Sequence, residues 1–116
     1  MALAECKTRL TELFLGFNEI GELGGMALAG ALPNTHITML HLSGNHLGDQ
    51  AAKDLAEALP NSYVTCLHAF NNNIQNFGAL ELAKVLPDTF LVNLQLLSNR
   101  IDKATQQKMT SGRLFI

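Results

Sequence analysis

The chain of 116 residues has room for one domain, and its 47% hydrophobic content is enough to fill the core of that domain. A formal net charge of −2 argues against a general nucleic-acid binder, and no apolar run reaches the ~18 residues that a membrane span requires. The two cysteines, Cys6 and Cys66, do not indicate a disulfide framework, and Glu5 interrupts any secretory signal, so we expect a cytoplasmic protein.

Residues 1–9 read as the end of a unit that recurs later in the chain. Ala2-Leu3-Ala4 matches Ala27-Leu28-Ala29, but the strand and most of the helix of such a unit do not precede it. Two interpretations stay open. The segment is either an abbreviated N-terminal cap, with a polar outer face supplied by Glu5, Lys7 and Arg9, or a partial repeat from a longer array.

The rest of the chain consists of copies of one unit. Residues 10–36, 37–63 and 64–90 form three full copies, and residues 91–116 form a divergent C-terminal repeat or cap. Leucine positions and a proline recur at the same step, so the repeat is not a chance alignment. Asparagines also recur at one position of the unit, with the same spacing each time: Asn18, Asn45, Asn72 and Asn99.

Each full unit predicts a strand followed by a helix. The alternation in Leu40-His41-Leu42 indicates a strand whose leucines point into a core. Parallel strands need a crossover of about a dozen residues, usually a helix, and we predict helices over Glu22–Leu32, Asp49–Leu59 and Asn76–Leu86. Asp49 and Asn76 are placed to act as N-caps. Because a proline disfavours helical backbone in the residue before it, we expect the helices to end at Pro33, Pro60 and Pro87.

The pattern Leu-x-x-Leu-x-Leu-x-x-Asn-x-Leu, followed by a Gly-Ala or Ala-Ala pair and a Leu-Ala pair, resembles the leucine-rich repeats of the ribonuclease-inhibitor-like subtype. The resemblance runs from Leu10 to about Met109. It implies a right-handed α/β solenoid, a segment of a horseshoe, with short parallel strands on the concave face and helices on the convex face. The resemblance is specific for fold and weak for function, because one fold hosts many activities.

The repeated asparagines have a structural explanation. Where the chain leaves a strand, backbone groups lose their sheet partners, and each buried group left unpaired would cost ~1–3 kcal/mol. An inward asparagine can donate to and accept from that turn. We therefore expect Asn18, Asn45, Asn72 and Asn99 to form a structural ladder rather than a catalytic site.

The outward strand positions distinguish this molecule from other repeat proteins. One column runs Phe14, His41, His68, Gln95, and the column before it runs Glu12, Met39, Cys66, Asn93. The column after them runs Gly16, Ser43, Phe70, Leu97, and an alternative for Leu97 and for nearby Phe17 is that they cover the turns. Exposed apolar surface commonly marks an interaction site. We therefore predict that a partner protein contacts Glu12, Phe14, Met39, His41, Cys66, His68, Phe70, Asn93 and Gln95.

Metal binding and catalysis are weaker hypotheses. His41, Cys66 and His68 offer three zinc-type ligands on one face, but no fourth ligand is evident, so we predict no metal and no cofactor. Gly21, Gly24 and Gly25 do not reproduce the spacing of a phosphate-binding loop or its lysine. Ser43 is close to His41 in sequence, but no acid is placed to orient the imidazole.

The last unit departs from the pattern. Polar Thr105-Gln106 replaces Gly-Ala, and Arg113 takes the place of a core leucine, as expected of a cap that faces water. A basic cluster with a single acid, Asp102, is either a solvated surface or a contact for an acidic partner: Arg100, Lys103, Lys108 and Arg113. The trailing Leu114, Phe115 and Ile116 either cover the open end of the core or continue into further sequence.

We therefore predict a non-catalytic scaffold for protein recognition through the concave sheet, with no nucleic-acid or membrane partner. The resemblance suggests a secreted bacterial effector acting in the host-cell cytosol, or part of a longer sensor or inhibitor array. Relatives also include a GTPase activator, which leaves a regulator of that kind as a minor alternative. We expect either a monomer or weak self-association through an edge. The structural alternative is a self-assembling fragment that pairs through an edge strand such as Thr11–Leu15.

Overall fold

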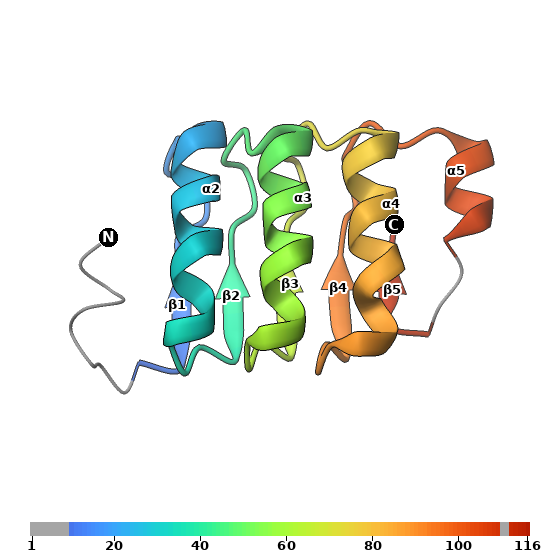
Figure 1. The fold of residues 1–116 in the computed structure, drawn as a ribbon. Coiled ribbons are helices and arrows are strands. Elements are labelled where there is room, and N and C mark those ends of the chain that lie inside the picture. Colours follow the sequence, from blue (N-terminus) through green and yellow to red (C-terminus); the bar gives the residue numbers. More distant parts are fainter. Residues whose placement is uncertain (1–9, 110–111) are drawn as a thin grey trace.

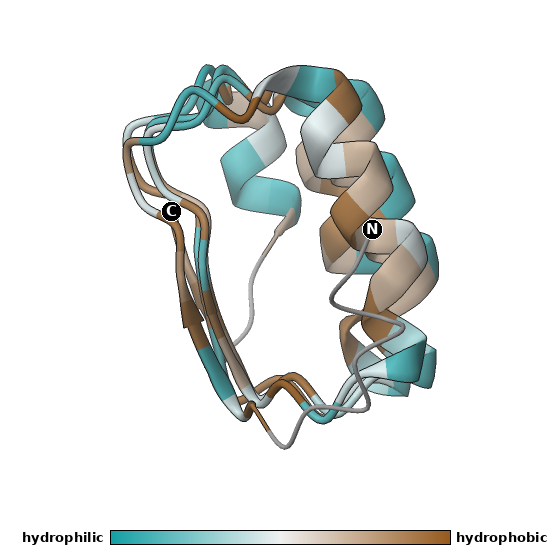
Figure 2. Cartoon of the chain, turned by 90° about the vertical axis from the view of Figure 1, so that its left-hand side faces the viewer, coloured by the Kyte–Doolittle hydropathy of each residue, from teal (hydrophilic) through white to brown (hydrophobic). Residues whose placement is uncertain are grey.

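The computed structural model describes residues 10–109 and 112–116, and these residues form two layers. One layer is a parallel sheet in the order β1-β2-β3-β4-β5, and helices cover one face of it (Figures 1 and 2). The strands are β1 (Glu12–Phe14), β2 (Met39–His41), β3 (Cys66–His68), β4 (Asn93–Gln95) and β5 (Leu114–Phe115). The predicted α/β leucine-rich-repeat solenoid is confirmed. The predicted N-terminal cap and Cys6 lie outside the described residues.

The helices lie close to their predicted positions but end differently. They are α2 (Gly21–Ala31), α3 (Gly48–Ala58), α4 (Asn76–Val85) and α5 (Lys103–Lys108). We predicted that prolines would end the first three, but each proline instead lies within a 3₁₀ turn that follows the helix. A proline fits at the start of such a turn because its missing N–H has no partner there anyway. These turns span Leu32–Asn34, Leu59–Asn61 and Leu86–Asp88.

A hydroxyl that we did not predict follows each 3₁₀ turn, and it is buried at Thr35 and Ser62 and partly buried at Thr89. Thr35 Oγ1 donates to the Leu32 carbonyl at 2.9 Å, and Ser62 Oγ donates to the Leu59 carbonyl at 2.8 Å. Each hydroxyl also accepts from a backbone N–H two residues later. These bonds satisfy polar groups that the turn would otherwise leave buried and unpaired. The third repeat has the same arrangement at Thr89.

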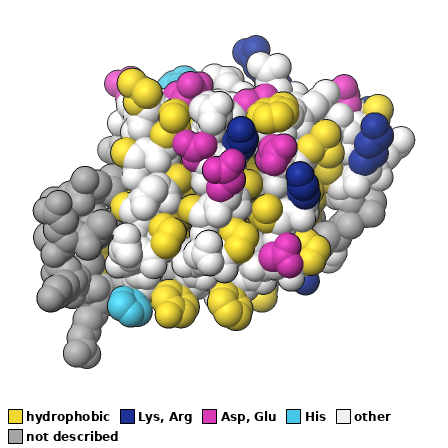
Figure 3. Space-filling view, in the orientation of Figure 1, with side chains coloured by type: hydrophobic (Ala, Val, Ile, Leu, Met, Phe, Trp, Pro, Cys, Tyr) yellow, Lys and Arg dark blue, Asp and Glu magenta, His cyan; other side chains and the backbone are white. Residues whose placement is uncertain are grey.

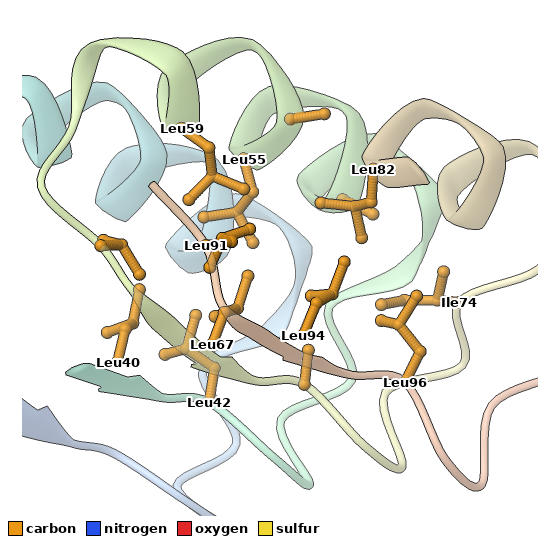
Figure 4. Packing of buried hydrophobic residues seen from close by; sticks show 14 of the residues in the cluster. Leu40, Leu42, Leu55, Leu59, Leu67, Ile74, Leu82, Leu91, Leu94 and Leu96 are labelled. Carbon is orange, nitrogen blue, oxygen red and sulfur yellow. The ribbon is translucent and has the colours of Figure 1, made fainter. Parts of the chain in front are cut away.

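The core lies between the sheet and the helices (Figure 4). Leu40, Leu67 and Leu94 are aligned on neighbouring strands, and each is 0% exposed. Fully burying a leucine side chain contributes roughly 1.5–3 kcal/mol. Strands pair at ~4.8 Å, whereas packed helices need about 8–10 Å, so the array curves toward its strand side. The outward face of the sheet is therefore the concave face.

The asparagines after the strands connect neighbouring repeats. Asn72 Oδ1 accepts from the backbone N–H of Asn45 at 2.8 Å and from that of Leu47 at 3.4 Å. Its Nδ2 donates to the carbonyls of Leu42 and Phe70. Asn45 and Asn99 make the equivalent bonds in their own turns. Each of these amides therefore satisfies polar groups in two successive repeats.

Asn18 differs from its equivalents. Its side chain is exposed, and in the described part of the chain its Nδ2 bonds to the Gly16 carbonyl at 3.1 Å. We predicted an inward side chain for all members of the series, and Asn18 contradicts that prediction. The other members bond to the turn of the repeat before their own, and no described repeat precedes the one that contains Asn18.

The predicted N-caps are wrong, because both side chains bond to the next repeat. Asp49 lies in the first turn of α3, and its Oδ1 accepts from the backbone N–H of Gln75 at 2.7 Å. Asn76 accepts from the backbone N–H of Asp102 and donates to the Asp102 carboxylate. Of the described helices, α5 is the one with a side-chain N-cap, since Asp102 accepts from the Thr105 N–H at 2.7 Å.

The C-terminal tail forms a fifth strand that we did not predict. Leu114 of β5 pairs with Leu94 of β4. On its other side Leu94 pairs with Leu67, which precedes it by one full repeat. The separation in sequence between Leu94 and Leu114 is shorter than one repeat. The offset is shorter because α5 has 6 residues, where α3 has 11. Leu114 is 9% exposed and Ile116 packs against the core, so the tail covers the core end. Arg113 is not a solvated cap residue, since its guanidinium donates to the carbonyls of Leu86 and Leu91.

Candidate functional site

The outward side of the sheet presents a regular array of side chains, which we call the strand face. It consists of the outward residues of the strands together with Phe70, which follows β3. Pairing aligns Phe14 with His41, His41 with His68, and His68 with Gln95. In each of β2, β3 and β4 the middle residue is buried and its two neighbours are partly exposed. The members are Glu12, Phe14, Met39, His41, Cys66, His68, Phe70, Asn93, Gln95 and Phe115.

Four rings of the strand face form one contiguous cluster centred on His41. The His41 and His68 ring centroids are 5.0 Å apart, and the rings are tilted by 56°. Phe14 lies 6.1 Å from His41 on one side, and Phe70 meets His41 edge to face at 5.9 Å. Edge-to-face and tilted pairs at these separations are attractive beyond the area they bury. The cluster therefore combines apolar rings with two imidazoles that can donate and accept hydrogen bonds.

Burial and charge act on the titratable groups of the strand face. Desolvation lowers the pKa of His68 from its usual value, and the nearby charge of His41 lowers it further. Desolvation raises the pKa of the Cys66 thiol. Both changes favour the uncharged form, so His68 and Cys66 are neutral near pH 7. Cys66 is consequently a weak nucleophile.

The structure does not bring the three zinc-type residues together as a metal site. His41 and His68 are adjacent, but across residues 10–109 and 112–116 no three His, Cys, Asp or Glu side chains are arranged to hold a metal ion. Cys66 belongs to the neighbouring column, where it is aligned with Met39 and Asn93. One polar atom of that column is unpaired, because Asn93 Oδ1 is buried and has no hydrogen-bond partner.

We predicted that Ser43 would face outward in the third column, and this prediction is wrong because Ser43 is 0% exposed. The strand β2 ends at His41, so alternation no longer sets the direction of a side chain two residues later. The alternative interpretation was that Phe17 covers a turn. Its contact agrees with this interpretation, because the Phe17 ring lies over Gly44 of the next turn. A Cβ added at Gly44 would clash with Cδ1 of Phe17. Phe17 nevertheless remains 65% exposed.

Two sets of exposed rings were missed by sequence analysis. Phe115 on β5 is aligned with Gln95, so it extends the column of Phe14 and the two histidines. The second set lies where each 3₁₀ turn leads into a strand. These turns form the lower edge of the molecule in the view of Figure 3, and hydrophobic side chains gather along that edge. There the His36 and Tyr63 rings stack at 5.6 Å, and Phe90 of the next repeat is 63% exposed. The recurrence of a ring at one position of each full repeat was a readable signal for this second set.

Comparisons with known proteins agree with the fold. A family profile described as Leucine Rich repeat matches residues 7–29 and 34–56. A solved structure described as Leiomodin-1 Actin-Binding Site 2 (ABS2) superposes with a TM-score of 0.83 at 19% sequence identity, covering 93% of this chain and 66% of that one. No curated protein sequence matches. The chain therefore has the fold of a leucine-rich-repeat solenoid, and at this identity the similar structure bears on fold alone.

Among the described residues, no helix is long and apolar enough to cross a membrane.

Proposed function

We propose that this chain is a non-catalytic protein-recognition scaffold of the ribonuclease-inhibitor-like subtype, and that its partner binds on the strand face. The observation that carries the proposal is the cluster of Phe14, His41, His68 and Phe70 on neighbouring strands. Phe14 is 61% exposed, although it stands on a sheet whose other side is closely packed. Aromatic residues are enriched at interfaces.

The rigidity of the sheet supports recognition. Each strand is held by its neighbours, and in β2, β3 and β4 the residue between the two outward positions is a fully buried leucine. Side chains on such a support lose little conformational freedom when a partner binds, so less of the interaction energy is offset by ordering. The cluster is also mixed in character, since the rings offer apolar area and the imidazoles offer hydrogen bonds.

The test is affinity capture from cytosol with matched variants, read by quantitative mass spectrometry. The double variant Phe14→Ser/Phe70→Ser removes two rings from the strand face. The control Phe77→Ser/Phe90→Ser removes two rings that are 52% and 63% exposed on other faces. A partner that the control retains and the strand-face variant loses supports the proposal. Partners retained equally by both variants contradict it.

Actin is a sensible first purified protein for this test, because the similar structure is described as an actin-binding site of leiomodin-1. Co-sedimentation with filaments and gel filtration with monomeric actin compare the same two double variants. Binding that only the strand-face variant loses would name the partner. Absence of binding would exclude actin as the partner. The strand-face proposal would then be tested by the capture experiment alone.

Self-association is the second candidate. The observation in its favour is that β1 is the first strand of the sheet, and among the described strands it pairs with β2 alone. An unpaired strand edge is a template for pairing with another chain. Light scattering across a wide concentration range separates the candidates. A mass that rises with concentration supports association, and a constant monomer mass excludes it.

A further inference from the structure

The centre of the strand face is a pair of histidines on neighbouring strands. His41 and His68 are aligned in the sheet, and their ring centroids are 5.0 Å apart. The two edges of the pair differ, since Phe14 and Phe70 flank His41, whereas Gln95 is aligned with His68. A group that binds over the pair therefore meets apolar rings on one side and an amide on the other.

Few other charges act on this pair. On β1 the titratable group of the strand face is Glu12, which lies in the neighbouring column and is aligned with Met39. On β3 it is Cys66, whose pKa is raised by burial and which stays neutral. The described outward residues of β4 and β5 carry no charge: Asn93, Gln95 and Phe115. The imidazoles are thus the groups of the described strand face that can become cationic.

The charge of His41 opposes the protonation of His68. Burial and the charge of His41 both lower the pKa of His68, so adding a second proton to the pair is unfavourable in the free protein. A negative group placed against both rings would reverse this effect, because an opposite charge within ~4–6 Å favours the charged form. A positive group would add to the repulsion that a charged His41 already exerts on a charged His68.

We infer that the partner contributes an acidic peptide segment whose carboxylate lies over His41 and His68, with apolar side chains against Phe14 and Phe70. This inference rests on the proposed function, because it names the chemistry of the partner at that same face. Protonated imidazoles donate charge-assisted hydrogen bonds to a carboxylate, and these are stronger than neutral ones. The rings beside the pair exclude water and accept the apolar neighbours of the acidic residue.

The pH dependence of binding follows from the same geometry. The bound carboxylate raises the pKa of the imidazoles in the complex above their values in the free protein. The gain in affinity is complete when the pH is below the imidazole pKa of the free protein. It is lost as the pH rises through the imidazole pKa of the complex. A rise of about one pKa unit at one histidine corresponds to about tenfold in affinity. For each histidine whose pKa rises by about one unit, binding should therefore weaken several-fold, and by at most about tenfold, between about pH 5.5 and about pH 7.5.

The experiment selects ligands from a random octapeptide phage library at about pH 5.5 and about pH 7.5, on either side of the usual histidine pKa. The targets are the natural sequence, His41→Gln/His68→Gln, and Phe14→Ser/Phe70→Ser. We expect the natural sequence at low pH to select peptides with Asp or Glu beside aromatic or aliphatic residues. The glutamine variant should lose the acidic preference, and the serine variant should lose the peptides altogether.

A selected peptide, made synthetically with a fluorescent label, then gives the affinities. Its Asp→Asn or Glu→Gln version should bind with little pH dependence. As a second measurement, the ¹³C and ¹H signals of the histidine rings report the pKa of each imidazole with and without the peptide. We expect both values to rise on binding. This measurement uses the natural sequence, so it does not depend on whether the glutamine variant folds.

The outcomes separate the two proposals. Peptides that require Phe14 and Phe70 but show neither an acidic residue nor a pH dependence would overturn the acidic-partner inference and leave strand-face recognition standing. A library that returns no peptide dependent on Phe14 and Phe70 would count against the proposed function itself. Histidine pKa values that stay constant or fall when an acidic peptide binds would also refute the inference.

Discussion

The middle repeats and the end repeats of this solenoid contain the same kinds of residue in different surroundings. Asn72 is buried and bonds to two successive turns, whereas Asn18 is exposed and its side chain bonds to Gly16 within the described chain. Leu67 is 0% exposed, while Leu13, the equivalent residue of β1, is only partly buried. The difference teaches that the contribution of a repeat residue to stability depends on the repeats on both sides of it.

Replacing a core leucine should show the largest contrast between the two regions. Leu67→Ala removes methyl groups from a fully buried site and should lower the free energy of unfolding by about 3 kcal/mol or more. Leu13→Ala makes the same chemical change at a partly exposed site, so a loss of about 1 kcal/mol is expected. Urea denaturation followed by circular dichroism measures both. Equal losses would contradict the comparison.

The asparagine pair should give the next largest contrast. Asn72→Ala leaves the N–H groups of Asn45 and Leu47 and two carbonyls without their side-chain partner, and we expect a loss of about 2–3 kcal/mol. Asn18→Ala should change stability by less than about 0.5 kcal/mol, because its side chain is exposed. Hydrogen exchange at the Asn45 and Leu47 amides supplies the local readout. Unchanged protection there in the Asn72 variant would refute the prediction.

The C-terminal strand allows the same contrast within one element. Leu114→Ala removes a residue that is 9% exposed and closes the core end, and a loss of about 2 kcal/mol is expected. Phe115→Ala, next to it, removes a ring that is 46% exposed and should cost less than about 0.5 kcal/mol. Thermal unfolding of the two variants tests the assignment of β5. A larger loss from the phenylalanine would mean that the tail is turned the other way.

The smallest effect concerns Asp102 at the start of α5. Hydrogen bonds from Thr105 lower the pKa of its carboxyl, with smaller contributions from Asn76 and Lys108. A carboxyl with a lowered pKa stabilises the fold above its unfolded pKa, and this contribution is lost as the pH falls through the folded pKa. Asp102→Ala should therefore destabilise the protein slightly at neutral pH and less in strong acid. Parallel denaturation curves across that pH range give the difference.

Much of the strand face could be predicted because its geometry follows from one period. With the strands evenly spaced along the chain, alternation alone places Phe14, His41 and His68 side by side, and the register agrees. Alternation stops where the strand stops, so it failed for Ser43 just beyond β2. The separation of the two imidazoles, and the lowered pKa of His68 that burial and then the charge of His41 cause, required side-chain positions.

The errors at Asp49, Asn76 and Arg113 have a common cause. Each residue was interpreted within its own repeat, where Asp and Asn cap helices and Arg faces water. In the solenoid each side chain instead bonds to another repeat, at Gln75, Asp102 and Leu86 respectively. Period analysis identifies equivalent residues, but it does not say which polar groups of a neighbouring repeat come within reach.

The sequence by itself determined the repeating unit, its strand and helix, the order and register of β1 to β4, and the identity of most outward side chains. These features depend on local periodicity, and the same periodic pattern recurs in every copy of the unit. The tertiary structure decided the features that depart from the repeat, which are the shortened α5, the fifth strand and the exposed side chain of Asn18. It also decided the closeness of the histidine pair. Such features depend on which groups a neighbouring repeat leaves uncovered, and no single unit contains that information.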